Sequence, residues 1–240
     1  MAILADLHVH SAASHDGKDS LSAIAAQAKK LGLHAVAVCD HDVCTAAEKT
    51  DDILFIPGVE ISTREGHILG LFLQKPIDAA VLEHDTMPSA ADAIDAIHAF
   101  GGIAVLAHPF APQKCDEDTL ISLPVDAVEA VNARAALHKG ANERAFKLAK
   151  AKNCPTCAGS DAHEVGELGG CHTWFETDEL SLDALKNALL DGRCKPVFIR
   201  PCRWRYKGFA RVRRDKNWHC TNFKTYAYLL GALLRGLLQR

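Results

Sequence analysis

Short apolar segments alternate with longer amphipathic segments over most of the chain. The apolar segments have the length and composition of buried strands, and they lie at residues 3–9, 35–39, 53–61, 66–73, 103–107, 127–131 and 156–160. The amphipathic segments repeat apolar side chains every three or four positions, which predicts helices at residues 21–31, 90–100, 138–152 and 182–190. Strand alternating with helix predicts parallel βαβ units, and about seven such units in this length favour an α/β barrel over an open sheet.

The chain departs from this alternation at two places. Residues 62–65 leave only a short gap between two predicted strands, which indicates a hairpin or a sharp turn. Beyond Arg200 the chain is mixed basic and aromatic, and residues 226–238 have the apolar spacing of one more helix, which we expect to dock on the barrel or on a second subunit. We therefore expect a barrel at residues 1–199 and a basic aromatic C-terminal extension at residues 200–240.

Histidine and carboxylate residues recur where the predicted strands end. Seven of them lie at or just beyond the C-terminal end of a strand: His8, His10, His41, Glu60, His108, Asp161 and His163. That end is the catalytic face of a (β/α) barrel. Imidazole and carboxylate together suit divalent ions such as Zn, Mn or Fe, whereas a set of thiolates would indicate structural zinc. Asp16 and His67 bring the candidate ligands to nine, more than one ion needs, so we expect two or three ions.

The overall composition is that of one globular domain. The 240 residues are 48% hydrophobic, which is enough to bury one core. The chain opens without the features of a signal peptide and has no apolar run of membrane-spanning length, so we expect a cytoplasmic protein. Nine cysteines, an odd number, favour reduced thiols over a disulfide framework. The CxxC pair Cys154 and Cys157 has no second pair to complete a zinc site, and we interpret both as buried cysteines.

The net charge of −3 conceals an asymmetry. Residues 200–240 hold 11 Lys and Arg residues against one acidic residue, Asp215, while the first 199 residues hold 16 against 29. An acidic body suits a cation-binding site, and a basic extension suits either an anionic partner or docking on that body.

Five short motifs carry most of the candidate ligands. They are Asp6-Leu7-His8-Val9-His10-Ser11, Cys39-Asp40-His41-Asp42, Gly58-Val59-Glu60, Ala107-His108-Pro109 and Gly159-Ser160-Asp161-Ala162-His163. In this order they resemble the polymerase and histidinol phosphatase (PHP) family of metal-dependent phosphoesterases, over roughly residues 3–200. The resemblance implies a distorted TIM-like (β/α)7 barrel with the metal site at the C-terminal ends of the strands.

The resemblance also implies a ligand set for each of three ions. His8, His10, Glu60 and Asp161 would hold one ion; Glu60 would bridge to a second held by His67 and His108; and Asp16, His41 and His163 would hold a third. His67 could instead be a structural histidine on its strand. Asp16 has a rival in the adjacent His15.

Such a site predicts hydrolysis of a phosphate ester. Clustered divalent ions lower the pKa of bound water and bind the phosphoryl oxygens, where negative charge gathers. We expect His41, His163 and Asp161 to be catalytic, with a histidine or a third ion assisting the leaving group. The substrate would be a small phosphorylated metabolite, a nucleotide or a short oligonucleotide, and a preference for monoesters or diesters stays open.

Residues outside the metal set are candidates for binding the substrate. Arg64 and Arg134 could clamp the phosphate, since a guanidinium group matches two phosphate oxygens, or could be solvated loop charges. Asn132 lies at a strand end and could contact substrate or cap a turn. Asp42 could orient a histidine or begin a helix at residues 43–49.

Two other functions fit the extension. Aromatic residues stand among its basic residues, as in proteins that bind single-stranded nucleic acid, so the chain could be a nucleic-acid-binding module whose barrel is a nuclease or inactive. The Leu-rich face of the terminal helix, with its basic flanks, also permits a role at a membrane surface. The oligomeric state stays open.

Overall fold

The computed structural model describes residues 2–45, 52–77, 87–111, 115–214 and 223–238. The described strands are β1 (Ile3–Val9), β2 (Ala35–Val38), β3 (Leu54–Ser62), β4 (His67–Leu71), β5 (Ile103–Leu106), β6 (Ala127–Asn132), β7 (Thr156–Gly159), β8 (Cys171–Phe175) and β9 (Cys194–Phe198). The described helices are α1 (Leu21–Lys30), α3 (Ala90–Ala99), α4 (Glu117–Ser122), α5 (Ala141–Lys152), α6 (Leu182–Leu190), α7 (Trp204–Arg214) and α8 (Phe223–Leu237), with a 3-10 turn η1 (Ala135–Leu137).

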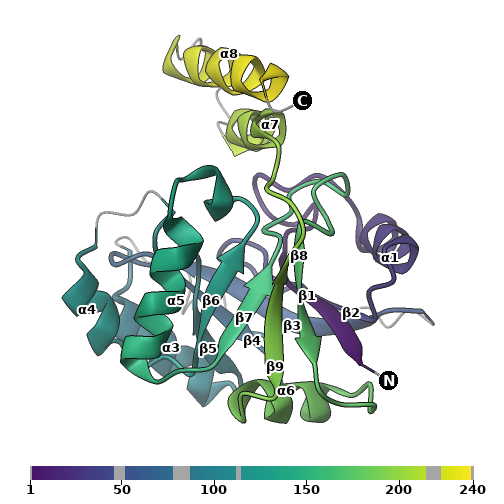
Figure 1. Cartoon of the computed structure of the whole chain (residues 1–240), viewed down its shortest axis with the longest axis vertical. Coiled ribbons are helices and arrows are strands. Elements are labelled where there is room, and N and C mark those ends of the chain that lie inside the picture. The colour runs from purple at the N-terminus through teal and green to yellow at the C-terminus, as the bar shows by residue number, and fades with distance from the viewer. Residues whose placement is uncertain (1, 46–51, 78–86, 112–114, 215–222, 239–240) are drawn as a thin grey trace.

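The strands form one curled sheet in the order β7-β6-β5-β4-β3-β2-β1-β8-β9, in which β7 returns beside β1. The backbone N–H of Asp161 donates to the carbonyl of His8, and that of His10 donates to the carbonyl of Ala162, both at 2.8 Å. Gly159 permits this approach, because a Cβ there would lie 2.2 Å from the Cβ of His8. The barrel is therefore nearly closed, which confirms the predicted distorted TIM-like fold (Figure 1).

The strands are not all parallel. β1, β2 and β3 are parallel, as are β5, β6 and β7, as the sequence predicts. β4 is antiparallel to both of its neighbours, which confirms the hairpin at residues 62–65 and makes the expectation of parallel strands wrong there. The reason is the length of the connection, since a parallel crossover needs a dozen or more residues. β8 and β9 are also antiparallel and were not predicted, because neither is a continuous apolar segment: β8 alternates buried with half-buried residues, and β9 has no buried residue.

Apolar side chains fill the barrel and the layer beneath its helices. Ile94 and Ile97 of α3 pack in one core cluster with residues of β4 and β5. The predicted helices form with short polar caps: the Ser20 hydroxyl accepts the N–H of Ala23 at α1, and Ser89 forms a capping box at α3. The cysteines that the structure describes are all free thiols, in line with the expected reduced state.

The extension forms two helices that lie beyond the end of the barrel opposite α6 (Figure 1). α8 confirms the helix predicted at residues 226–238 and begins earlier, at Phe223. α7 was not predicted, because five basic residues interrupt its apolar spacing. The two helices pack closely at Gly208, where a Cβ would lie 3.0 Å from the Cβ of Ala232. Among the described residues, no helix combines the length and the apolar character that crossing a bilayer requires. The domain division at residues 199 and 200 stays a prediction.

Candidate metal centre

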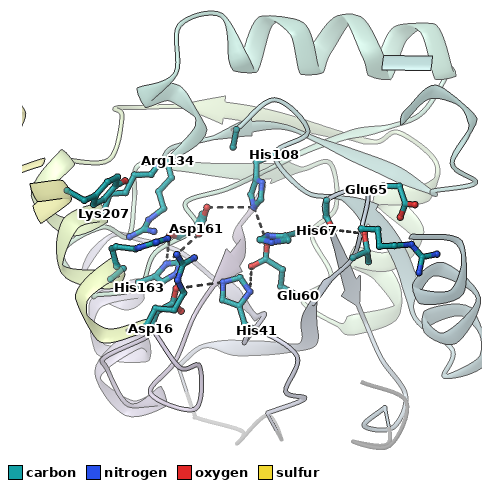
Figure 2. A pocket seen from close by; sticks show the side chains of 18 residues that line it. Asp16, His41, Glu60, Glu65, His67, His108, Arg134, Asp161, His163 and Lys207 are labelled. Carbon is teal, nitrogen blue, oxygen red and sulfur yellow. Dashed lines mark hydrogen bonds and ion pairs between the residues drawn. The ribbon is translucent and has the colours of Figure 1, made fainter. Parts of the chain in front are cut away.

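The nine predicted ligands come together at one end of the barrel. They are His8 in β1 and His10 just after it, Asp16 in the next loop, His41 after β2, Glu60 in β3, His67 at the start of β4, His108 after β5, and Asp161 and His163 after β7. Because β4 is antiparallel, its first residue lies at the end where β3 finishes, and His67 pairs with Ser62. Figure 2 shows how the ligands that line the cavity face one another.

The carboxylate of Glu60 lies at the centre of this cluster and is 1% exposed. Its Oε1 lies 2.7 Å from Nδ1 of His67 and 3.0 Å from Nε2 of His108. Its Oε2 lies 3.2 Å from Nε2 of His8 and 3.2 Å from Nε2 of His10. Each oxygen thus faces its own set of imidazoles, which is the arrangement expected of a carboxylate that bridges two ions.

Asp16, His41 and His163 form a neighbouring group. Asp16 Oδ2 lies 3.1 Å from Nε2 of His163 and 3.8 Å from Nε2 of His41. His41 also belongs to the first group, since its Nδ1 lies 3.3 Å from Oε2 of Glu60. The rival His15 is exposed and contacts the cluster only through the His41 ring, with 5.1 Å between centroids. The geometry therefore favours Asp16 as the ligand.

The partition into ion sites differs from that implied by the resemblance. Among the residues that the structure describes, four sets of ligand atoms lie close enough to hold one ion: His10, Asp16, His41 and His163; His8, Glu60 and His108; His8, His10 and Asp161; and His41, Glu60 and His67. Glu60 and three histidines, His8, His10 and His41, each appear in two sets. The nine residues are thus one continuous cluster, and their assignment to individual ions stays a prediction.

The tautomer of His8 suits a metal ligand. Its Nδ1 lies 3.1 Å from Oε1 of Glu129, so this nitrogen carries the hydrogen and donates it. In the neutral ring Nε2 then presents a lone pair, which faces the Glu60 oxygen and Nε2 of His10, both at 3.2 Å. Lone pairs that face each other at this distance need a proton or a metal ion between them. Burial lowers the pKa of His8, but Glu60 and Glu129 outweigh it and raise that pKa well above its ordinary value, so a bound metal ion would displace a proton here.

His163 repeats this arrangement on the other side of the cluster. Its Nδ1 lies 2.9 Å from the carbonyl oxygen of Asp161, which can only accept, so Nε2 presents its lone pair to the Asp16 carboxylate at 3.1 Å. Two ligand atoms about 2.1 Å from one tetrahedral ion lie about 3.4 Å apart, close to these separations. The donor set and its spacing therefore fit bound divalent ions.

The electrostatics of the cluster also favour bound cations. Burial would raise the pKa of Glu60, but His41 and the other imidazoles outweigh it and hold that pKa well below its ordinary range. Burial lowers the pKa of His10, yet its hydrogen bonds to Asp161 and Glu60 raise it to about 9, so without a metal ion this ring carries a proton that a bound cation would displace. Burial lowers the pKa of His41 to about 3, so this ring is neutral at pH 7, as a metal ligand must be.

Glu129 supports the cluster and was missed by the sequence analysis. Besides His8, it accepts the backbone N–H of His108 at 2.9 Å and the side-chain amide of Asn132 at 3.0 Å. It is 1% exposed in the middle of β6. The available signal was a charged residue at the centre of an otherwise apolar strand, where a carboxylate must have a partner.

Replacement of Glu129 by glutamine tests this support. The glutamine side chain keeps one acceptor oxygen, but its amide nitrogen cannot accept, and it no longer carries the charge that holds the Nδ1 hydrogen of His8. We expect metal affinity, measured by titration with a chelator, to fall by roughly 10- to 100-fold while the fold is kept. Asp126→Asn is the control, because Asp126 pairs with His98 at the other end of the barrel. Equal losses in the two variants would contradict the prediction.

Glu167 was also missed and supports a second ligand. This buried carboxylate accepts the backbone N–H of His163 at 2.7 Å and pairs with Nε of Arg134 at 3.1 Å. It lies in the loop after β7, where nothing in the sequence distinguished it from the residues beside it. Only the return of β7 beside β1 brings it under the site.

The predicted substrate residues occupy different positions. Arg64 and Arg134 both line the cavity at the cluster, Arg64 from its exposed rim and Arg134 at 9% exposure. Asn132 lies behind it: its Oδ1 accepts the N–H groups of Arg134 and Ala135, and its Nδ2 points at Asp161. Asn132 therefore positions the loop after β6, and its role as a substrate contact stays a prediction.

Asp42 has neither of its expected roles among the described residues. Its Oδ1 accepts the N–H of Ser62 at 2.8 Å and so fastens the end of β3. The helix expected at residues 43–49 does not begin at residues 43–45, and residues 46–49 lie outside the described part.

The cluster opens into a cavity of about 620 Å³. Cations as well as ligands line it, and they are Arg64, Arg134, Lys207, Arg211 and Arg214. Three of these belong to α7, which the sequence analysis placed apart from the site. Burial lowers the pKa of Lys207 to about 8, and its Nζ lies 2.8 Å from Nε2 of His138. The extension is thus a wall of the cavity.

Comparisons with known proteins agree with this site. Residues 6–100 match the family model described as the PHP domain, and residues 139–194 match the model described as PHP-associated. The uncharacterized protein MJ1587 of Methanocaldococcus jannaschii is 34% identical over 146 residues, which cover 54% of this chain and 81% of that protein.

Two solved structures share the fold at low identity. A two-domain protein from Bacteroides vulgatus, containing a predicted PHP-like metal-dependent phosphoesterase, is 21% identical with a TM-score of 0.64, over 82% of this chain and 65% of that one. The lesion-specific endonuclease EndoQ of Pyrococcus furiosus is 17% identical with a TM-score of 0.57, over 82% of this chain and 58% of that one. The chain thus spans under two thirds of each protein.

Proposed function

The chain belongs to the PHP family of metal-dependent phosphoesterases, and on that premise we propose that it hydrolyses a phosphate ester of a small phosphorylated molecule at the cluster around Glu60. One observation carries the proposal: the two oxygens of this buried carboxylate face separate sets of imidazoles. A carboxylate so placed suits a site with at least two ions, which is the arrangement that phosphoryl-transfer enzymes use.

The nine clustered residues would hold two or three divalent ions. Zn, Mn and Fe are the metals that suit this mixed set of imidazoles and carboxylates. Such ions would supply an acidified water and stabilise the negative charge on the phosphoryl oxygens. The protein's own groups would orient the ester: Arg64 and Arg134 reach the cavity from two sides. His41, His163 and Asp161 line the same cavity, within reach of a substrate held there.

A nucleic-acid substrate is the second candidate, and the likeness to an endonuclease in fold favours it. The structure gives less support than the sequence to the idea that the aromatic residues of the extension bind nucleic acid. The ring of Trp204 is covered by Arg235, with 4.4 Å between guanidinium carbon and ring centroid, and by Lys207 at 5.6 Å. These two cations compete with a base for the faces of the ring. The cations that line a concave cavity fit a small anionic ester better.

The proposal is tested by hydrolysis of paired aryl phosphate monoesters and diesters by Mn-loaded and Zn-loaded protein, with a short single-stranded oligonucleotide alongside. We expect turnover of at least one aryl ester, its loss on chelation, and its return when the metal is restored. His8→Ala and Asp161→Asn should both fall to background, which excludes a contaminating phosphatase. Absence of aryl turnover with bound metal, together with cleavage of the oligonucleotide, would replace the small-molecule function with the nuclease.

A further inference from the structure

The face of α7 that lines the cavity is basic. Lys207, Ala210, Arg211 and Arg214 line the cavity, and their spacing of three and four positions places them on one side of the helix. Gly208, one position after Lys207, packs on α8. α7 therefore presents three cations to the same space that the metal cluster opens into.

Within the described part of the chain, no carboxylate forms an ion pair with any of these three cations. Arg211 and Arg214 are exposed, whereas Arg205 of the same helix stacks on the ring of Tyr206 at 4.8 Å. Of the acidic groups that line the cavity, Asp16, Glu60 and Asp161 belong to the metal cluster, and Glu65 accepts the backbone N–H of Ala90. Cations gathered in a cavity without an acidic partner favour an anionic ligand.

A single phosphoryl group does not account for both the metal cluster and the cations of α7. Its oxygens would be held by the ions at Glu60 and by Arg64 or Arg134, leaving the α7 cations for another group. The cavity of about 620 Å³ lies within the ~300–1,000 Å³ range of sites for whole small molecules. Residues 200–240 also lie outside both segments matched by the family models, so this wall belongs to the chain's own extension.

We propose that α7 forms a second anion-binding subsite, in which Arg211 and Arg214, with Lys207, hold a phosphate on the substrate other than the one hydrolysed. The substrate class is then a small molecule that carries two phosphate groups. This inference rests on the proposed function and narrows it. The extension becomes the element that selects the substrate.

Direct binding tests the subsite without requiring turnover. The full chain, loaded with Mn²⁺, is titrated by calorimetry with propylphosphonate and with propane-1,3-bisphosphonate, two non-hydrolysable ligands that differ by one anionic group. We expect the bisphosphonate to bind at least about tenfold more tightly, and the variant Arg211→Ala, Arg214→Ala to lose about tenfold of that affinity while its affinity for propylphosphonate is unchanged. Arg203→Ala removes an exposed arginine that does not line the cavity and is the matched control.

The outcomes separate the subsite from the reaction. If the double variant loses only the bisphosphonate preference, the subsite holds, whether or not aryl phosphates are hydrolysed. Equal binding of the two phosphonates by the unaltered protein would overturn the subsite even if turnover is robust. The subsite would also be overturned if the unaltered protein showed no preference for the bisphosphonate and the double variant bound a single-stranded oligonucleotide more weakly. In that case α7 would bind a polynucleotide backbone.

Discussion

Replacement of Glu60 by glutamine is expected to lower kcat for aryl phosphate hydrolysis by roughly 1,000-fold, beyond the ~10- to 100-fold typical of residues that only support a ligand. Glutamine keeps the shape of the side chain but replaces one oxygen with an amide nitrogen, which cannot coordinate a cation. The two sets of imidazoles around Glu60 would then lose their shared anion. Metal content, measured by elemental analysis of the dialysed protein, is expected to fall by at least one ion per chain.

Glu65→Gln provides a matched control in the same cavity. Glu65 also lines the cavity, but its Oε2 accepts the backbone N–H of Ala90 at 2.7 Å, and it belongs to none of the possible ligand sets (Figure 2). We expect this variant to keep its metal content and most of its activity. If Glu60→Gln kept both its ions and a kcat within tenfold of the unaltered protein, the bridging role of Glu60 would be wrong.

Most of the candidate ligands could be placed together from the sequence because they follow recognisable strands. His8, His41 and His108 stand where short apolar segments end, and the ends of parallel strands meet on one face of a barrel. His67 shows the limit of that argument. It begins its strand, and it reaches the cluster because β4 is antiparallel, which follows from the length of the turn before it.

The supporting residues could not be predicted, because their contacts join segments that are distant in the sequence. Glu129 reaches His8 across 121 positions, and Glu167 reaches Arg134 across 33. The residues around each partner therefore give no pattern that identifies the other one. The role of α7 was hidden for a related reason: its basic residues indicate an anionic partner, but only packing against the barrel places Lys207 in the wall of the cavity.

Glu167→Ala is expected to destabilise the protein by about 3–5 kcal/mol, the usual cost of removing one partner of a buried ion pair. Arg134 is 9% exposed and Glu167 1%, and the variant would leave the guanidinium group without its nearest counter-charge. The backbone N–H of His163 would also lose its acceptor. Urea unfolding of metal-free protein measures the change without a contribution from bound ions.

Two further variants separate charge from hydrogen bonding. Asp191→Ala breaks an exposed ion pair, in which the side chain of Asp191 is 59% exposed and that of Arg193 is 46% exposed. This variant should lose at most about 1 kcal/mol of stability. The double variant Arg134→Met, Glu167→Leu removes both buried charges, so it should recover most of the loss. It should retain only the cost of the backbone N–H groups of His163 and Glu164 that lose this acceptor, ~1–3 kcal/mol for a buried one. If the double variant were as unstable as Glu167→Ala, the unpaired charge would not be the cause, and the lost support of His163 would account for the whole effect.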